Sequence, residues 1–281
     1  MNSAAKRCRT FRSLLWRIIG GTGFGAVRWI AHNFKLRKAA GMSPQSTQVI
    51  KLDHVEISAE PWPWEFAITR RNEITRYFAR KQRKQPGLWN GQVLLMHRYT
   101  ISNRVLRGSC FITEFASFLA WRDWNYPDPS IRDFFAAAGL CAADGAYLLG
   151  EMGLHTSRAG LCYFPCGTPE PADLDINGDL DLVVNLRREL REETGIELKE
   201  LQAEPGWTPV HDRGILALIK RLTALESADQ LRSRILCHLA SEHLPELNDI
   251  HIVNGPADID HRIAPFVVAY LQNVWRDASG P

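Results

Sequence analysis

Three glutamates close together, followed by a glycine, are the feature that most constrains how this chain can fold. Residues 186–197 read LRRELREETGIE, in which the acids are Glu189, Glu192 and Glu193. Asp179 or Asp181 can cap a helix at its N-terminus, and Gly195 can end it. The sequence therefore predicts a helix of about four turns from near 181 to 194. That helix must bury one face while it carries a dense group of like charges.

The predicted helix separates its apolar side chains, its acids and its arginines. At about 100° per residue, four side chains form one stripe that we expect to be buried: Leu182, Val183, Leu186 and Leu190. The three glutamates share one flank of this stripe. Glu189 and Glu193 are a like-charge pair at i, i+4, which costs roughly a few tenths of a kcal/mol on an isolated helix. A solvated helix with surface ion pairs is the simpler interpretation, but the sorted signs favour a divalent cation with oxygen ligands, Mg²⁺ in particular.

The run RELREETGI, residues 188–196, resembles the second half of the Nudix box, REUxEExGU with U aliphatic, at every fixed position. The surrounding order is also similar to that family: an apolar hairpin and the loop FPCGTPE come before, and a strand and two helices follow. The first half of the box departs from the pattern. When it is aligned on Gly167, Asp173 stands where Glu is expected, and fourteen residues instead of seven precede Arg188. We infer a seven-residue insertion within LDINGDLDL, where Asn177 and Gly178 suit a tight turn.

The resemblance implies an enzyme that hydrolyses a nucleoside diphosphate linked to another moiety, with Mg²⁺ or Mn²⁺ as cofactor. It implies four metal ligands, the last through its backbone carbonyl: Glu189, Glu192, Glu193 and Gly167. It implies that Glu189 or Glu193 acts as the base and that Arg188 orients a glutamate by ion pairing. Glu242 and Glu246 are alternative bases, although solvated helix-end acids are the simpler interpretation of both.

The nature of the substrate is less constrained by the sequence. Arg158 and Arg213 are candidate phosphate contacts by position. The segment before the motif faintly resembles the preceding domain of Nudix proteins that act on nucleotide sugars, which favours a nucleotide sugar or ADP-ribose type of substrate. A pyrophosphatase that removes unwanted nucleoside triphosphates is one alternative, and a non-catalytic nucleotide-binding module is another. Three tryptophans could stack on a base but are expected in the core instead: Trp89, Trp121 and Trp124.

The expected fold class is α+β. The resemblance implies a Nudix α/β/α sandwich with a mixed sheet over 130–281, and a small α+β domain over 49–129 precedes it. The turn-rich NYPDPS, residues 125–130, marks the boundary. Alternation and helical spacing predict strands over 49–59, 92–102, 104–113 and 214–225, a hairpin around Asp144 and Gly145, and further helices over 66–84, 113–124, 228–244 and 262–275.

Charge is concentrated at the N-terminus. Residues 1–52 hold ten Lys and Arg and no acid, whereas the whole chain has a net charge of +3, so the rest is mildly acidic. A basic body that grips nucleic acid is therefore not indicated. Residues 1–48 form a basic segment with three interpretations: a disordered leader, a cleaved targeting segment, or an amphipathic anchor in which residues 1–41 contact a membrane surface.

The six cysteines lack any CxxC pair. This favours reduced thiols and a cytoplasmic protein. The closest pair, Cys162 and Cys166, has no second pair at ligand spacing, so no zinc site is expected. Cys166 stands where the family commonly has glycine, and we interpret it as a packed or loop thiol. The sequence does not indicate an oligomeric state.

Overall fold

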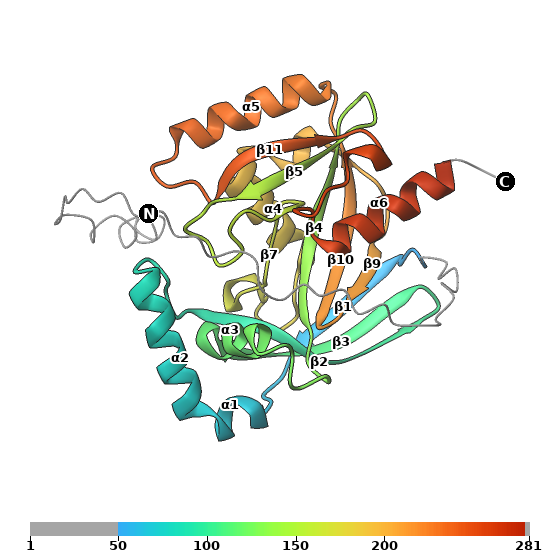
Figure 1. The fold of residues 1–281 in the computed structure, drawn as a ribbon. Helices are drawn as coiled ribbons and strands as arrows, with labels where there is room; N and C mark the ends of the chain where they lie inside the picture. The colour runs from blue at the N-terminus through green and yellow to red at the C-terminus, as the bar shows by residue number, and fades with distance from the viewer. Residues whose placement is uncertain (1–49, 279–281) are drawn as a thin grey trace, which may run out of the picture. The chain divides into compact units, whose positions relative to one another are not determined.

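The computed structural model describes residues 50–278, which Figure 1 shows in colour. The predictions for residues 1–48, including membrane contact by 1–41, lie outside the described residues. The described residues belong to one compact unit. The division into one domain over 49–129 and another over 130–281 stays a prediction. Between residues 50 and 278, no helix is both long enough and apolar enough to cross a membrane.

A mixed sheet forms the centre of the C-terminal part. Its strands run in the order β11-β5-β4-β10-β8, and β6, β7 and β9 add short pairings to β5, β4 and β10. β4 and β10 pair in parallel from Ile215 opposite Asp133 to Thr223 opposite Cys141. The strands are β4 (Asp133–Cys141), β5 (Tyr147–Met152), β6 (Cys162–Tyr163), β7 (Cys166–Gly167), β8 (Gln202–Ala203), β9 (Thr208–Asp212), β10 (Ile215–Thr223) and β11 (Leu247–Val253).

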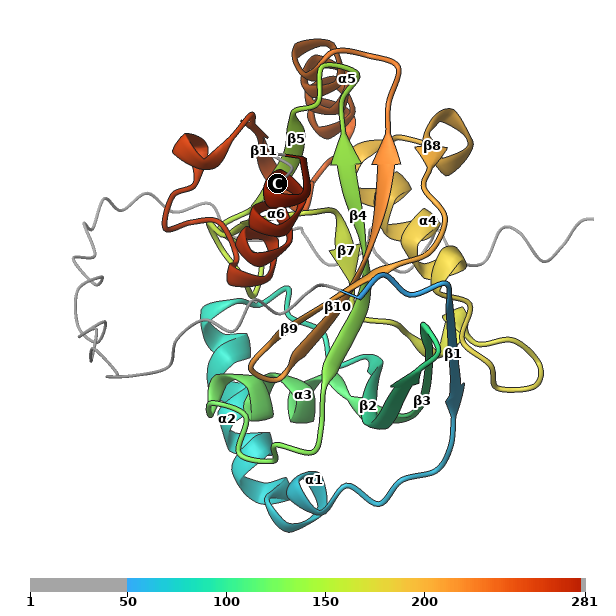
Figure 2. The ribbon, with the colours of Figure 1, turned by 90° about the vertical axis from the view of Figure 1, so that its right-hand side faces the viewer.

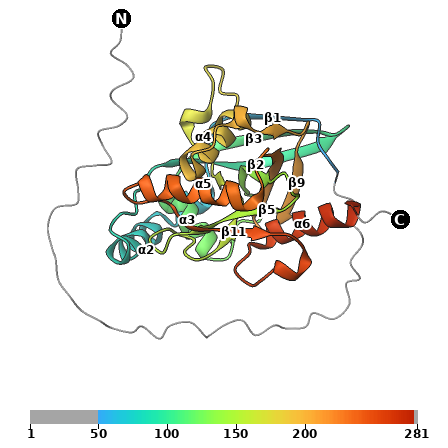
Figure 3. The same ribbon diagram turned by 90° about the horizontal axis from the view of Figure 1, so that it is seen from above.

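Helices cover both faces of this sheet. α4 (Leu182–Thr194) and α5 (Ala228–Ser241) pack on one face, and α6 (Pro265–Ala278) packs on the other. Figure 2 shows α4 and α6 on opposite sides of β4 and β10, and Figure 3 shows α4 next to α5. β4 is buried along its whole length because Phe134 faces α4 and α5 while Phe135 faces α6. The predicted α+β class with an α/β/α sandwich is confirmed.

A three-stranded sheet in the order β1-β3-β2 forms the N-terminal part. One face carries helices and an aromatic core that includes the fully buried Trp121, as expected. The other face contributes Leu94, Met96 and Leu106 to the core that α4 also joins. The two sheets therefore share buried surface. The elements are β1 (His54–Ala59), α1 (Glu65–Thr69), α2 (Arg71–Lys84), β2 (Gln92–Ser102), β3 (Val105–Glu114) and α3 (Phe115–Asp123).

Three sequence-based expectations were wrong in detail. The single helix over 66–84 is two helices, because Arg70 leaves helical geometry (φ −102°, ψ 15°) with its side chain over the rings of Phe66 and Trp124. Val183 is 38% exposed instead of buried, since it lies at the edge of the stripe centred on Leu186. Trp89 is 79% exposed, whereas core packing was expected. The pairings of β8, β9 and β11 and three short 3-10 helices were not predicted: Pro171–Asp173, Leu198–Glu200 and Pro256–Asp258.

The inferred insertion forms a turn that pairs with β1. Leu174 bridges Leu180 across the turn, and Gly178 has a positive φ of 83°, as expected for a tight turn. The Leu180 amide donates to the Ile57 carbonyl at 2.8 Å, and the Ala59 amide donates to the Gly178 carbonyl at 2.8 Å. The segment that leads into α4 is thereby fixed to the three-stranded sheet.

The caps of α4 match the sequence analysis and allow a stability test. The Asp181 side chain accepts hydrogen bonds from the amides of Val183 (2.9 Å) and Val184 (3.1 Å), and Gly195 ends the helix with φ 72°. Asp181→Ala removes the oxygen that accepts both bonds, and we expect it to lower the free energy of unfolding by about 1 kcal/mol in urea denaturation. Asp179→Ala is the matched control because its exposed side chain accepts neither bond. Equal losses in the two variants would contradict the capping role.

Candidate active site

Two of the three glutamates are buried against the short strand β7. Glu189 is 8% exposed and Glu193 is 4% exposed. The Cys166 amide donates a hydrogen bond to Glu193 Oε2 at 3.2 Å. A Cβ atom placed on Gly167 would lie 2.4 Å from Glu189 Oε1, so a larger residue there would require the carboxylate to move. The structure thus brings together three of the four predicted metal ligands, while the fourth, Glu192, has a side chain 59% exposed at the rim.

Arg188 joins this group to the first half of the motif. Its guanidinium contacts Asp173 (Nη2 to Oδ2, 3.0 Å), Glu189 (Nη1 to Oε1, 2.5 Å) and Glu192 (Nη1 to Oε2, 3.5 Å). Asp173 is buried and also accepts from Asn185 Nδ2 at 3.1 Å. The alignment on Gly167 assigned Asp173 to the position of the first glutamate of the motif. In the structure this acid lies beside Arg188. Arg188 is positioned to orient Glu189.

The electrostatics of the buried pair favour an additional positive charge. Burial raises the pKa of Glu189 to about 7, although Arg188 opposes that shift. Burial, together with the nearby charges of Glu189 and Glu246, raises the pKa of Glu193 well above its ordinary value. Glu246 therefore lies within electrostatic reach of both acids. Among the described residues, no hydrogen bond or ion pair joins Glu242 to them.

The donor set fits a hard divalent cation. It offers two buried carboxylates one helical turn apart, the exposed carboxylate of Glu192, and the backbone of Gly167 next to Glu189. Mg²⁺ and Mn²⁺ prefer oxygen donors of this kind and leave positions for water and phosphate. Glu189, Glu192, Glu193 and the Gly167 carbonyl are the groups that could hold such an ion.

A second polar group lies beside Cys166. Arg158 Nη2 is 3.6 Å from Oδ2 of the buried Asp133, which also accepts from Thr168 Oγ1 at 3.2 Å. Burial, Glu193 and Glu189 raise the pKa of the Cys166 thiol, while Arg158 acts in the opposite direction. Arg158 and the two glutamates therefore all lie near enough to Cys166 to affect the pKa of its thiol. The sequence reasoning missed Asp133, although an acid at the start of the apolar run DFFAAAGLC was a usable signal.

Arg213, the other predicted phosphate contact, lies in the turn whose Gly214 carbonyl accepts a hydrogen bond from the Asp133 amide at 2.8 Å. It is exposed at the turn between β9 and β10, with a positive φ of 49°. Within residues 50–278, no hydrogen bond or ion pair links it to the acids. The structure therefore brings Arg158, and not Arg213, towards Cys166 and the buried glutamates.

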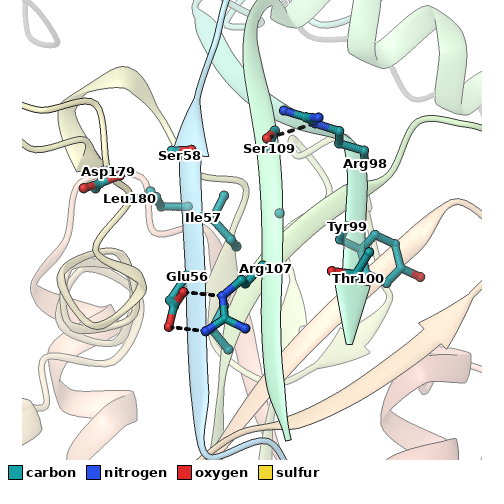
Figure 4. A pocket seen from close by; sticks show the side chains of 12 residues that line it. Glu56, Ile57, Ser58, Arg98, Tyr99, Thr100, Arg107, Ser109, Asp179 and Leu180 are labelled. Carbon is teal, nitrogen blue, oxygen red and sulfur yellow. Dashed lines mark hydrogen bonds and ion pairs between the residues drawn. The ribbon is translucent and has the colours of Figure 1, made fainter. Parts of the chain in front are cut away.

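A groove of about 740 Å³ lies on the three-stranded sheet, next to the inserted turn (Figure 4). Its arginines are already neutralised: Arg107 pairs with Glu56 (2.8 Å), and Arg98 pairs with Glu60 (3.0 Å). Asp179 and Leu180 of the insertion line one side of it. Both arginines of the groove therefore already have acidic partners.

No protein-family model matches the sequence, and no curated protein does. Similar solved structures include a Nudix hydrolase from M. smegmatis, RenU, with 15% identity, TM-score 0.35, and 53% of this chain and 88% of that chain covered. They also include a MutT protein from Methanosarcina mazei Go1 (14%, 0.36, 52% and 95%) and a C. elegans Ap4A hydrolase (12%, 0.35, 53% and 98%). These TM-scores are too low to support an assignment, which must therefore depend on the chain's own residues.

The buried acids predict a characteristic dependence of stability on pH in the absence of divalent cations. The folded chain raises the pKa of Glu189 from 4.5 to about 7, so the folded state binds this proton more tightly than the unfolded state. The resulting stabilisation is complete below pH 4.5 and is lost as the pH rises to about 7. Over this pH range the wild type should lose up to about 3 kcal/mol of its free energy of unfolding through Glu189, and Glu189→Gln should not. Urea denaturation at several pH values in the presence of a chelator measures the difference.

Glu197→Gln controls for the loss of one negative charge, because Glu197 forms a surface pair with Arg191 at 3.2 Å. The control should keep the wild-type dependence on pH. If Glu189→Gln also kept it, Glu189 would not carry the buried charge described above.

Proposed function

We propose that this chain is a Nudix-type hydrolase, dependent on Mg²⁺ or Mn²⁺, that cleaves a nucleoside diphosphate linked to another moiety. One observation carries the proposal: Glu189 and Glu193 are buried side by side against Cys166 and Gly167. Two ionised carboxylates at a buried position need a compensating cation, and such a cation can also bind the oxygens of a pyrophosphate.

The chain's own residues have separable roles in this proposal. Glu189, Glu192, Glu193 and the Gly167 carbonyl would hold the ion, which would supply positive charge against the pyrophosphate and polarise a water molecule. Arg188, fixed by Asp173, holds Glu189 in place. Arg158 offers a cation to a phosphate oxygen. Water adds to one phosphorus, the bridging P–O bond breaks, and a carboxylate accepts the proton of the water.

Three carboxylates are candidates for that proton acceptor. Glu189 and Glu193 are inside the site, and Glu246 is exposed but acts electrostatically on both. The raised pKa of a buried carboxylate suits a base that must accept a proton near neutral pH. Glu242 is the less favoured of the two later acids because no contact joins it to the site.

The first prediction from this proposal concerns turnover. Glu193→Gln should lower kcat for Mg²⁺-dependent hydrolysis by at least about 100-fold, because a carboxylate needed for the ion is lost. Its stability without divalent cations should be equal to or above that of the wild type, since the substitution relieves repulsion. Glu197→Gln is the control and should keep wild-type kcat. A fully active, well-folded Glu193→Gln protein would contradict the proposal.

Product analysis over a substrate panel separates the alternatives. Nucleotide sugars and ADP-ribose should give two monophosphate products, whereas a triphosphate-cleaving enzyme would release inorganic pyrophosphate. A binding module would be stabilised by nucleotide and Mg²⁺ in a thermal shift assay without forming any product.

The second prediction concerns the two arginines. Arg158→Ala should raise KM for the preferred substrate by about tenfold with a smaller change in kcat, because it removes a cation that pairs with a phosphate oxygen. Arg213→Ala, at the exposed β9–β10 turn, should change KM less than twofold. Steady-state kinetics of both variants make the comparison. If Arg213→Ala had the larger effect, the phosphate would lie at the β9–β10 turn instead.

A further inference from the structure

Three side chains that can ligate a metal converge from three strands on the α6 face of the mixed sheet. They are Glu151 on β5, Cys162 on β6 and His251 on β11, and one ligand atom from each lies within 4.8 Å of the others. Glu151 and Cys162 are direct partners in the ladder, and His251 stands opposite Leu149 of β5. Cys162 and Leu149 both belong to the core under α6. The buried acids of α4 belong to the opposite face.

We propose that Glu151, Cys162 and His251 bind one Zn²⁺ ion, at a site separate from the candidate active site. A thiolate, an imidazole nitrogen and a carboxylate form a mixed soft and borderline donor set that suits Zn²⁺ and not Mg²⁺. Three protein ligands leave the fourth tetrahedral position for water. The side chains of Glu151 and His251 are 21% and 26% exposed, so the site is open to solvent on one side. This inference does not depend on the proposed hydrolase function.

The cluster is hard to explain as an ion-pair network alone. Glu151 Oε2 is 2.7 Å from His251 Nε2 and 3.2 Å from Arg262 Nη1, which accounts for the acid and the histidine. Neither contact needs a sulfur atom. Cys162 is fully buried, and no side-chain hydrogen bond to its Sγ is formed among residues 50–278.

Arg262 is the group that competes with the metal for Glu151. It has a second partner of its own, because Nε and Nη2 bond Asp260 Oδ2 at 3.0 and 2.7 Å. Glu151 can therefore leave Arg262 without stranding the guanidinium. Removing a metal ligand should weaken Zn²⁺ binding, whereas removing Arg262 should strengthen it.

The test is a metal titration of the full chain. The protein, freed of metal by chelator, is titrated with Zn²⁺ against a chromophoric competitor and with Co²⁺ while the absorbance of the thiolate-to-cobalt charge-transfer band is recorded. We expect a charge-transfer band that saturates at one Co²⁺ per chain. Cys162→Ser should abolish the band, and His251→Gln should weaken Zn²⁺ binding at least about tenfold.

Several controls keep this test decisive. Cys237→Ser, at an exposed thiol, should leave the Zn²⁺ affinity unchanged. Arg262→Gln should bind Zn²⁺ at least about threefold more tightly, since a competing positive charge is gone. If Cys162→Ser fails to fold, the partly exposed His251→Gln and Arg262→Gln variants still decide. No stoichiometric binding by the wild type, or binding unchanged by both Cys162→Ser and His251→Gln, would overturn the site.

Discussion

The burial of two neighbouring carboxylates against the backbone of β7 is the constraint on which the candidate site depends. α4 can place Glu189 and Glu193 there only because Leu186 and Leu190 anchor the helix in the core below the sheet. In its present position the Glu189 carboxylate occupies the space that a side chain at Gly167 would fill. Burying each of those leucines contributes roughly 1.5–3 kcal/mol, enough to offset the cost of moving a carboxylate out of water when that carboxylate is protonated or paired.

The inserted turn gives this version of the motif an unusual connection. Asp173 ends one short helix, contacts Arg188, and leads directly into the turn that pairs with β1. The three-stranded sheet and the start of α4 are therefore linked by backbone hydrogen bonds as well as by a shared core. A change in the N-terminal part has a direct physical route to the arginine that holds Glu189.

Local signals in the sequence were sufficient for most of the fold. The caps of α4, the hairpin at Asp144 and Gly145, and the apolar run of β10 follow from periodicity and turn chemistry. The break at Arg70 was not predicted, because no glycine or proline marks it in the sequence. In the structure the Arg70 side chain lies over the rings of Phe66 and Trp124. β8 and β9 were missed since short edge pairings have weak patterns, and β11 was missed because its alternation is broken by Asp249.

The same division applies to the two sites. The acids of α4 are consecutive in the sequence, so their spacing could be read directly. Glu151, Cys162 and His251 come from three strands that only the sheet brings together, and cysteine spacing alone argued against zinc. The contact between Asp133 and Arg158 could not be predicted either, because it depends on how the loop before β6 folds back to the start of β4.

The most direct measurement of the central claim is anomalous diffraction from crystals of the protein soaked in Mn²⁺. The account predicts an anomalous peak for a Mn²⁺ ion that is bound by carboxylate oxygens of Glu189 and Glu193 and by the carbonyl of Gly167. A structure in which Mn²⁺ binds elsewhere, while Glu189 stays paired with Arg188 and Glu193 stays bonded to the Cys166 amide, would contradict it.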